Sequence, residues 1–358
     1  MPIRETWLRQ VQETALAPDL PIIDAHHHLW FVSPGPVARS YDYLKDDYAR
    51  DATSGHNIVA SVHVECRNVL STSGPQKFWP VSETTWVNQI AELHARQSPG
   101  GPAIAAGIVG FADLTLGDEV DEVLAAHCGA APMRIRGIRQ ISTSSDVAAV
   151  VGRSQASPPH RLLDPQFRRG FSHLARHRLS FDAWLYHPQL SELIDLARTF
   201  PETSIVLNHL GAPLGAGPYS TRRPQVFQEW RKSIRELARC ENVFIKLGGS
   251  AMHMFGFEWE QRPLPPTSDE LIAATRHFYL EAIDSFSPAR CMFESNFPVD
   301  KERCSAVVLW NSFKKIAAGS TAEETADLFM NTAARVYRLG FPLQTEACPA
   351  SPQPVGQS

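Results

Sequence analysis

The chain has 358 residues, of which 43% are hydrophobic and 20% are charged, and its formal net charge is -4. Ample apolar content with a small net charge excludes a disordered chain and is typical of a folded globular protein. The slightly acidic balance, without a run of Lys or Arg, argues against a nucleic-acid binder.

The sequence predicts a cytoplasmic protein, because it lacks recognisable targeting signals and its cysteines are spaced like reduced thiols. No stretch of about 18 consecutive apolar residues is present, so the sequence predicts no membrane-spanning helix. The first 20 residues carry scattered charges and lack the apolar core of a secretory signal. Six cysteines are spread along the chain without CxxC spacing, a pattern that favours reduced thiols over a disulfide framework or a zinc knuckle.

Short apolar, strand-like runs alternate with amphipathic, helix-like segments along the chain. Strands are predicted at 21–26, 58–65, 103–111, 133–141, 179–186, 203–209, 242–248 and 289–296. Helices are predicted at 83–97, 118–128, 165–177, 189–199, 225–240, 268–286, 303–318 and 320–338, the last closing the bottom of a barrel. Eight βα units in series favour a (β/α)8 TIM barrel over a doubly wound sheet. No GxGxxG follows the first strand, so a dinucleotide-binding fold has no support.

The domain organisation is predicted to be simple. Residues 1–19 are expected to form a helical extension, residues 20–342 a single barrel domain, and the Pro-, Ser- and Gln-rich residues 343–358 a disordered tail. Five of the connections that follow strands are long: 29–57, 66–82, 142–164, 210–224 and 249–267. In a barrel such connections lie at the C-terminal face, where ligand sites are built.

The strongest chemical signal is the run IIDAHHHLW at residues 22–30. His26 and His28 are two positions apart at a strand end, so both side chains are predicted to face the barrel interior, whereas His27 faces the other way. Two imidazoles at one place can share a metal ion or polarise a carbonyl group. Trp30, which follows, is a candidate substrate contact.

Two further strand ends carry polar side chains. His209 ends the apolar strand in IVLNHLGAP and is expected at the same level of the barrel as His26 and His28. In MFESNFPVD, Asn296 is predicted at the cavity mouth and Glu294 about 6–7 Å deeper, from the rise of a strand. An interior carboxylate needs a partner or a metal, because burying it alone is unfavourable.

Other strand residues are weaker candidates, each of which could instead have a structural role. Glu65 ends the second predicted strand, and His187 lies just beyond the fifth. Three basic residues in or near strands could hold an anionic group of a substrate or form internal ion pairs: Arg136, Arg139 and Lys246.

In combination these motifs resemble the amidohydrolase superfamily, in particular the amidohydrolase-2 branch, which includes sugar-acid lactonases and pyrone-dicarboxylate lactonases. The resemblance covers roughly residues 20–340. It is carried by the DxHxH run (Asp24, His26 and His28), HLG at His209, RGIRQ, IKLGG and SNFPVD. It implies a TIM barrel and a hydrolase, most simply a lactonase that opens a cyclic ester of a small organic acid.

One position departs from the pattern of this branch. The family normally has an Asp at the end of strand eight, which deprotonates the attacking water and binds the metal in metal-containing relatives. Here the position is Asn296, and an amide cannot act as a base at neutral pH. Glu294, His209 or His187 would have to serve as the base, while Asn296 orients the water.

The cofactor and the reaction type therefore remain open. His26, His28 and His209 are the candidate ligands of a divalent metal such as Zn²⁺, with a metal-free reaction as the alternative. The expected partner is a small anionic or lactone-containing substrate, and a homo-oligomer is compatible with the sequence. Two other functions stay possible on the same scaffold: a decarboxylase or lyase, which needs no hydrolytic base, and a non-catalytic binding barrel.

Overall fold

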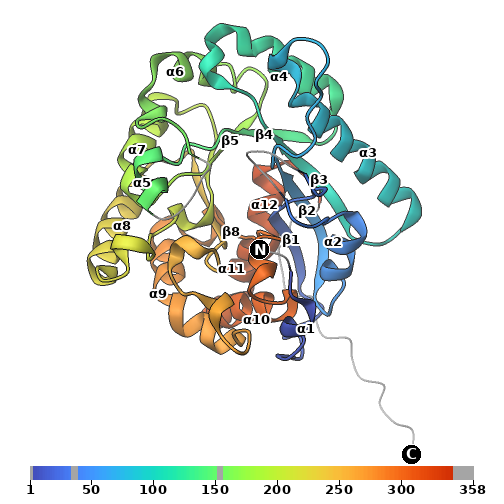
Figure 1. The fold of residues 1–358 in the computed structure, drawn as a ribbon, viewed down its shortest axis with the longest axis vertical. Helices are drawn as coiled ribbons and strands as arrows, with labels where there is room; N and C mark the ends of the chain where they lie inside the picture. Colours follow the sequence, from blue (N-terminus) through green and yellow to red (C-terminus); the bar gives the residue numbers. More distant parts are fainter. Residues whose placement is uncertain (1–2, 34–38, 151–155, 342–358) are drawn as a thin grey trace, which may run out of the picture.

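Eight parallel strands form the centre of the molecule (Figure 1). The structure is a computed structural model that describes residues 3–33, 39–150 and 156–341. The strands pair in chain order, and backbone bonds from His28 N to Phe297 O (2.7 Å) and from Asn296 N to His26 O (2.9 Å) join the last strand region to the first. The strands are β1 (Pro21–His27), β2 (Asn57–Val64), β3 (Ala103–Gly110), β4 (Ile135–Arg139), β5 (Ser180–Ala183), β6 (Ile205–Leu207), β7 (Val243–Leu247) and β8 (Cys291–Phe293). The predicted (β/α)8 barrel is confirmed.

Helices surround this barrel. They are α1 (Glu5–Leu8), α2 (Lys45–Ala52), α3 (Val81–Gln97), α4 (Val120–Ala130), α5 (Ser145–Val150), α6 (Pro165–Phe171), α7 (Leu190–Thr199), α8 (Arg223–Leu237), α9 (Ser268–Phe286), α10 (Ala306–Ile316), α11 (Ala322–Ala326) and α12 (Thr332–Val336). The predicted final helix at 320–338 is divided into α11, a π-helical turn over Asp327–Asn331, and α12. Two helices, α2 and α5, lie within long connections where no helix is predicted from the sequence.

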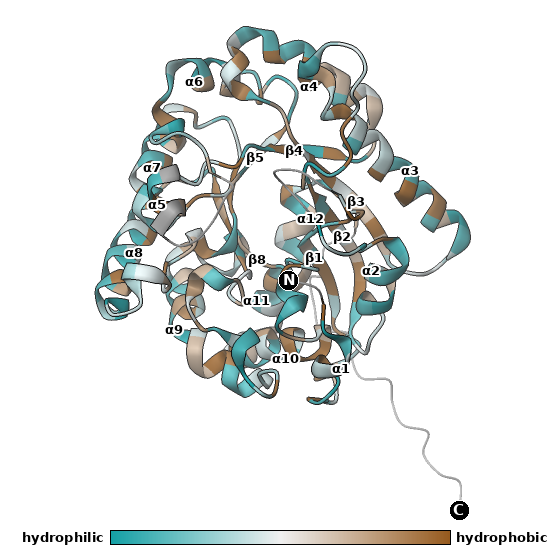
Figure 2. Ribbon diagram, viewed as in Figure 1, coloured by the Kyte–Doolittle hydropathy of each residue, from teal (hydrophilic) through white to brown (hydrophobic). Residues whose placement is uncertain are grey.

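Helix α9 illustrates how the outer layer is specified. Thr267 caps it by accepting from Glu270 N (3.2 Å), and the Glu270 carboxylate accepts from Thr267 N (2.8 Å), which is the reciprocal pattern of a capping box. Its buried side chains recur at helical spacing: Leu271, Thr275, Phe278, Tyr279, Ala282 and Phe286. Figure 2 shows the same division generally, with hydrophobic residues concentrated on the strands and on the helix faces that pack against them.

A second apolar cluster fills the interior of the barrel. Residues Met330, Ala333, Ala334 and Tyr337 pack against inward-facing strand residues such as Val62, so the C-terminal helical segment closes the barrel, and in Figure 1 α12 is seen through the ring of strands. The prediction of a last helix at the barrel bottom is borne out in this packing. Since the interior is closed at that end, a ligand can enter only from the opposite face.

The N-terminal extension differs from its prediction as a helical segment. Within the described residues 3–19 only Glu5–Leu8 forms an α-helix, and the Trp7 indole anchors the extension by donating to Arg262 O (3.2 Å) and Pro263 O (3.0 Å). The predicted disordered tail, 343–358, lies outside the described residues. The five described cysteines are all free thiols, and no helix in the described part of the chain combines the length and apolar character needed to cross a membrane.

Candidate active site

The candidate side chains lie where β1, β6 and β8 end. His26 is in β1, whereas His209 and Asn296 lie beyond β6 and β8 in left-handed backbone conformations, with φ of 53° and 54°. His26 and His28 face the same side, as predicted, with their Nε2 atoms 3.2 Å apart. His27 faces away and contacts Ser61 through Nε2 (3.0 Å). Turns after the strands, and not only strand periodicity, therefore bring these imidazoles together.

Glu294 joins two of the histidines. Its Oε1 accepts from His209 Nδ1 (2.6 Å) and from the His209 backbone N (3.1 Å). Its Oε2 lies 2.9 Å from His26 Nδ1, at an angle that makes no hydrogen bond, and has no hydrogen-bond partner among the described residues. Because Nδ1 of His209 is held by a carboxylate, Nε2 is left as the free nitrogen of that ring.

The contacts of these rings indicate which nitrogen of each carries the proton. The His28 Nδ1–H donates to Val64 O (2.7 Å), so Nε2 of a neutral His28 can only accept. A neutral His26 can then donate to His28 through Nε2 (3.2 Å), while its Nδ1 accepts from Lys246 Nζ (3.3 Å). Burial lowers the pKa of both His26 and His28 well below the usual value, so a second proton is disfavoured.

The donor atoms of this cluster suit a divalent cation, and they include Glu294 Oε2, which lacks a hydrogen-bond partner in the described part of the chain. Ligand atoms of His26, His209 and Glu294 lie within 4.8 Å of one another, and all three side chains are buried. The His28 Nδ1 bond to a backbone carbonyl is the arrangement that fixes the tautomer of metal-ligating histidines. The predicted metal set was His26, His28 and His209; in the structure the compact set contains Glu294, and His28 adjoins it through His26.

Two fixed cations flank His26. Lys246 Nζ lies 3.3 Å from His26 Nδ1 and donates to Asp182 (2.7 Å), with both side chains of this ion pair inaccessible to solvent. On the other side of the ring, Arg139 Nη1 lies 3.4 Å from His26 Nε2, and Arg139 Nε donates to Glu65 (2.7 Å). Each buried cation is thus neutralised by its own carboxylate, and both reach the histidine cluster.

The IKLGG motif has a steric explanation. A Cβ at Gly248 would lie 2.4 Å from the Glu294 side chain, and a Cβ at Gly249 would lie 2.5–2.8 Å from the His209 ring. Gly249 also has φ of 68°, which disfavours other residues. The two glycines after β7 therefore leave the space that the Glu294–His209 pair occupies.

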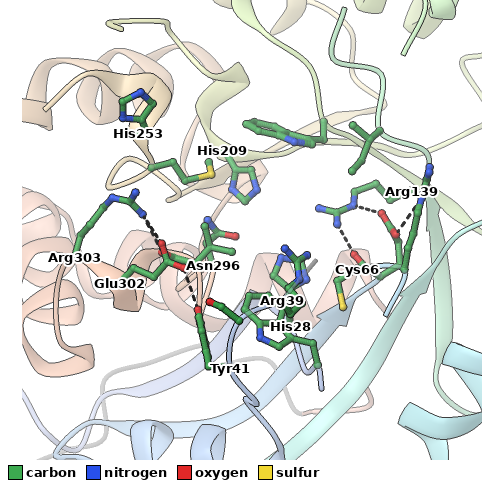
Figure 3. Close-up of a pocket in the computed structure, with 18 of the residues that line it drawn as sticks. His28, Arg39, Tyr41, Cys66, Arg139, His209, His253, Asn296, Glu302 and Arg303 are labelled. Atoms are coloured by element: carbon green, nitrogen blue, oxygen red, sulfur yellow. Dashed lines mark hydrogen bonds and ion pairs between the residues drawn. The ribbon is translucent and has the colours of Figure 1, made fainter. Parts of the chain in front are cut away.

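A cavity of about 330 Å³ opens above this cluster. Six of the predicted site residues line it: His28, Trp30, Glu65, Arg139, His209 and Asn296. Figure 3 shows Arg139 and Arg303 on opposite sides of the cavity, with His209, Asn296 and Arg39 between them. His26, Glu294 and Lys246 are fully buried beside these residues and do not line the cavity.

Two predicted site residues lie elsewhere. The Arg136 guanidinium donates to Ile135 O (2.8 Å) and to Met133 O, and borders a separate depression with Arg338. Arg136 and Arg139 have opposite strand parity, so only one of them faces the interior. His187 begins a short helical turn and accepts from Leu214 N (3.2 Å). The placement of both side chains gives no support to a substrate contact by Arg136 or a base role for His187.

Other residues in or beside the cavity are absent from the predicted set of site residues. Arg39 lies over the Trp30 ring at 4.2 Å, and Trp184 meets the His209 ring edge-on at 4.6 Å. Asp300 accepts a hydrogen bond from Asn296 (2.9 Å). Arg39 comes from a long connection without periodicity. Asp300 could have been suspected, because the SNFPVD motif ends on it.

The fold and this site are those of an amidohydrolase-type barrel, and comparison with known proteins gives the same class. The amidohydrolase family model matches residues 23–339. The chain is 34% identical to protein y4mH of Sinorhizobium fredii over 90% of this chain and 99% of that protein. The chain therefore belongs to the amidohydrolase family, and the predicted resemblance is confirmed.

Two further relatives are informative. The chain is 26% identical to an L-fucono-1,5-lactonase of Burkholderia multivorans, over 89% of this chain and 97% of the lactonase. An amidohydrolase from the same organism, solved with bound zinc, superposes with a TM-score of 0.65 at 25% identity, covering 88% of this chain and 99% of that one.

Proposed function

We propose that this protein hydrolyses a lactone, or a related cyclic ester, of a small organic acid. The observation that carries the proposal is the Glu294–His209 pair. Glu294 holds Nδ1 of His209, and the His209 side chain, with Nε2 free, lines the cavity. The lactonase relative supports this substrate class. A cavity of about 330 Å³ is at the small end of ligand sites and suits a single sugar-acid ring.

In this reaction His209 is the general base. Glu294 holds Nδ1–H and the backbone N–H, so the ring is fixed with Nε2 free to take a proton from water. Burial lowers the pKa of His209, against the opposing effect of Glu294, so the ring is neutral and competent near pH 7. Asn296 cannot replace it, because an amide takes up no proton at this pH.

The other side of the cluster stabilises the developing negative charge. Arg139, which lies 3.4 Å from His26 and lines the cavity, is a fixed cation in a buried setting where charge stabilisation is strong. Zn²⁺ or another divalent metal held by His26, His209 and Glu294 would occupy the lone pair of His209, so when bound it would act as a Lewis acid that activates the water in place of the His209 base.

Arg39 is the candidate contact for an anionic group of the substrate. Arg303 pairs with Glu260 and Glu302, and Arg139 pairs with Glu65. The Arg39 side chain makes no hydrogen bond or ion pair with any residue in 3–33, 39–150 or 156–341, and its Nε is buried. A guanidinium at the cavity without a hydrogen-bond partner among these residues suits a carboxylate, which it can bind with two parallel hydrogen bonds.

The test is a panel of sugar-acid 1,5-lactones that includes L-fucono-1,5-lactone, followed by acid release in ¹⁸O-labelled water. The expected result is label in the product carboxylate and a rate at least 100-fold above the uncatalysed rate. Release of carbon dioxide from an aromatic or keto acid, without lactone turnover, would support the decarboxylase alternative. No turnover of either class would favour a binding barrel, and either result would overturn the proposal.

Metal binding is tested separately from turnover. Zn²⁺ titrated into chelator-treated protein and followed by calorimetry is expected to bind with a stoichiometry near one. Binding should be lost in His26→Ala and retained in His187→Ala, since His187 lies outside the donor cluster. Equal binding by both variants would contradict the assigned ligands.

A further inference from the structure

Asp300 is a buried carboxyl group in direct contact with Asn296. Its Oδ1 accepts from Asn296 Nδ2 (2.9 Å), its Oδ2 accepts from Ala251 N (3.2 Å), and its side chain is inaccessible to solvent. The backbone N–H of Asp300 donates to Asn296 O (3.2 Å). The carboxylate that this branch normally has at the end of strand eight is therefore replaced by an amide with a carboxyl group behind it.

This contact determines which end of the Asn296 amide faces the cavity. An ionised carboxylate can only accept hydrogen bonds, so the NH₂ group of Asn296 must face Asp300. The amide oxygen is then the atom left for the cavity, which Asn296 lines. The backbone holds this arrangement, because Asn296 N donates to His26 O (2.9 Å).

We propose that Asp300 is a positioning residue that fixes Asn296 as a hydrogen-bond acceptor in the cavity. The inference rests on the proposed hydrolysis: the Asn296 oxygen accepts one hydrogen of the attacking water while His209 takes the other as a proton. The Asn296–Asp300 pair thus retains the acceptor function of a strand-eight carboxylate, and the base function belongs to His209. Orientation of a reacting water is worth a large factor in rate, because poorly aligned attack is slow.

The alternative is that Asp300 only fastens two loops, through Ala251 and the Asn296 backbone. Exchange of the two side chains separates these roles. In Asp300→Asn, the new amide oxygen accepts from Ala251 N, so its NH₂ faces Asn296 and the Asn296 amide must turn its own NH₂ into the cavity. In the double variant Asn296→Asp/Asp300→Asn, residue 296 is again an acceptor only, and the new amide at position 300 supplies the donor between the two side chains.

The first readout is turnover of the best lactone at pH 8.5. Burial raises the pKa of Asp300 to about 7, so at this pH the wild-type carboxyl group is ionised. Asp300→Asn is expected to lower kcat at least tenfold with KM changed less than threefold, and the double variant is expected to recover kcat to within about threefold of wild type. Wild-type kcat in Asp300→Asn, or a double variant as slow as the single one, would overturn the proposal.

The second readout needs no substrate, so it tests the role of Asp300 even if the proposed hydrolysis is wrong. In ¹⁵N NMR spectra the side-chain NH₂ signals of Asn296, assigned by their loss in Asn296→Asp, are expected to move in Asp300→Asn. Asn311, whose NH₂ donates to Glu13 (2.9 Å) far from the cavity, is the internal control and should not move. Unchanged Asn296 signals would overturn the proposal whatever the activity.

A third variant, Asn296→Ala, tests the proposal in case Asp300→Asn does not fold. Asn296→Ala removes the acceptor but leaves the bond between Asp300 and Ala251 N. It is expected to lose kcat at least tenfold and to remain folded, with a melting temperature lowered by alanine at a left-handed φ of 54° and by the lost hydrogen bond to Asp300. Full kcat in Asn296→Ala would overturn the proposal. Glu13→Gln, which alters the same kind of carboxylate–amide pair at Asn311, is the control and should keep wild-type kcat.

Discussion

Glu294 is the residue that contacts both His209 and His26 through its two carboxylate oxygens. One of its oxygens accepts two hydrogen bonds from His209, and the other lies 2.9 Å from His26. Its charge can stabilise the His209 imidazolium that forms when the base takes a proton, as the carboxylate of a Ser-His-Asp triad does. In the proposed reaction, Glu294 therefore orients His209 as the base and supports its charged form.

Glu294→Gln separates these two effects. The glutamine oxygen can still accept from His209, so the ring orientation is kept while the charge is lost. We expect kcat to fall about 10²- to 10⁴-fold, with little change in KM. His209→Gln should lose at least as much, and the double variant no more than the worse single one, because the two residues act as a unit. Additive losses in steady-state kinetics would contradict a shared role.

The prediction for Arg39 concerns substrate binding, because its proposed role is to contact the substrate and not to take part in the reaction. Arg39→Gln should raise KM for a carboxylated lactone about 10- to 100-fold, the loss expected for one charged hydrogen-bonded contact, and leave kcat within threefold. The control is a neutral lactone of the same ring size, for which KM should be unchanged. An equal effect on both substrates would indicate that Arg39 acts through packing on Trp30.

At the level of elements, the connections after β6, β7 and β8 build the site together. His209 follows β6, the Gly248–Gly249 pair follows β7, and Glu294 follows β8. The glycines provide room on one side, and the Trp184 ring packs edge-on against His209 on another. Three segments distant in the sequence thus restrict one imidazole.

Gly249→Ala tests this restriction. The added Cβ would lie within 2.8 Å of the His209 ring, at a backbone φ of 68°, so we expect a lower melting temperature and a loss of kcat of at least tenfold. Gly129→Ala is the matched control. Gly129 lies in α4 with open space at its Cβ position, and alanine there should leave kcat unchanged and stabilise the helix by about 0.5–1 kcal/mol. Equal kinetics in both variants would contradict the packing argument.

The same elements show what the sequence could and could not predict. The alternation of apolar strand-like runs with helical segments located all eight strands. The two-residue period of a strand predicted that His26 and His28 face the same side. It could not find the partners of residues that meet across the barrel, such as Lys246 and Asp182 (2.7 Å), because that pairing depends on closure of the sheet. Because Arg136 and Arg139 lie on opposite faces of one strand, strand periodicity could have excluded Arg136 from the predicted substrate contacts and kept Arg139. His187 lies where the chain has already turned into a helical segment.

At the level of the whole molecule, the fold buries many neutral imidazoles outside the site. His127 is one of them: it is inaccessible to solvent, and contacts Thr84 Oγ1 (2.9 Å) and Phe111 O (2.9 Å). Burial lowers its pKa from 6.5 to about 4. As the pH is lowered below 6.5, the unfolded chain therefore binds a proton at His127 that the folded protein does not bind. The free energy of unfolding decreases as the pH is lowered.

His127→Gln is expected to remove this part of the pH dependence. At pH 8 the variant should be less stable than wild type, because glutamine fills the site imperfectly. Between pH 8 and pH 5 the gap in unfolding free energy should narrow by about 2 kcal/mol, since only wild type loses the contribution of a histidine whose pKa falls from 6.5 to about 4 on folding. Urea unfolding at both pH values measures the gap, and between pH 8 and 9 it should stay constant. A gap that does not narrow at pH 5 would mean that His127 accepts its proton without unfolding.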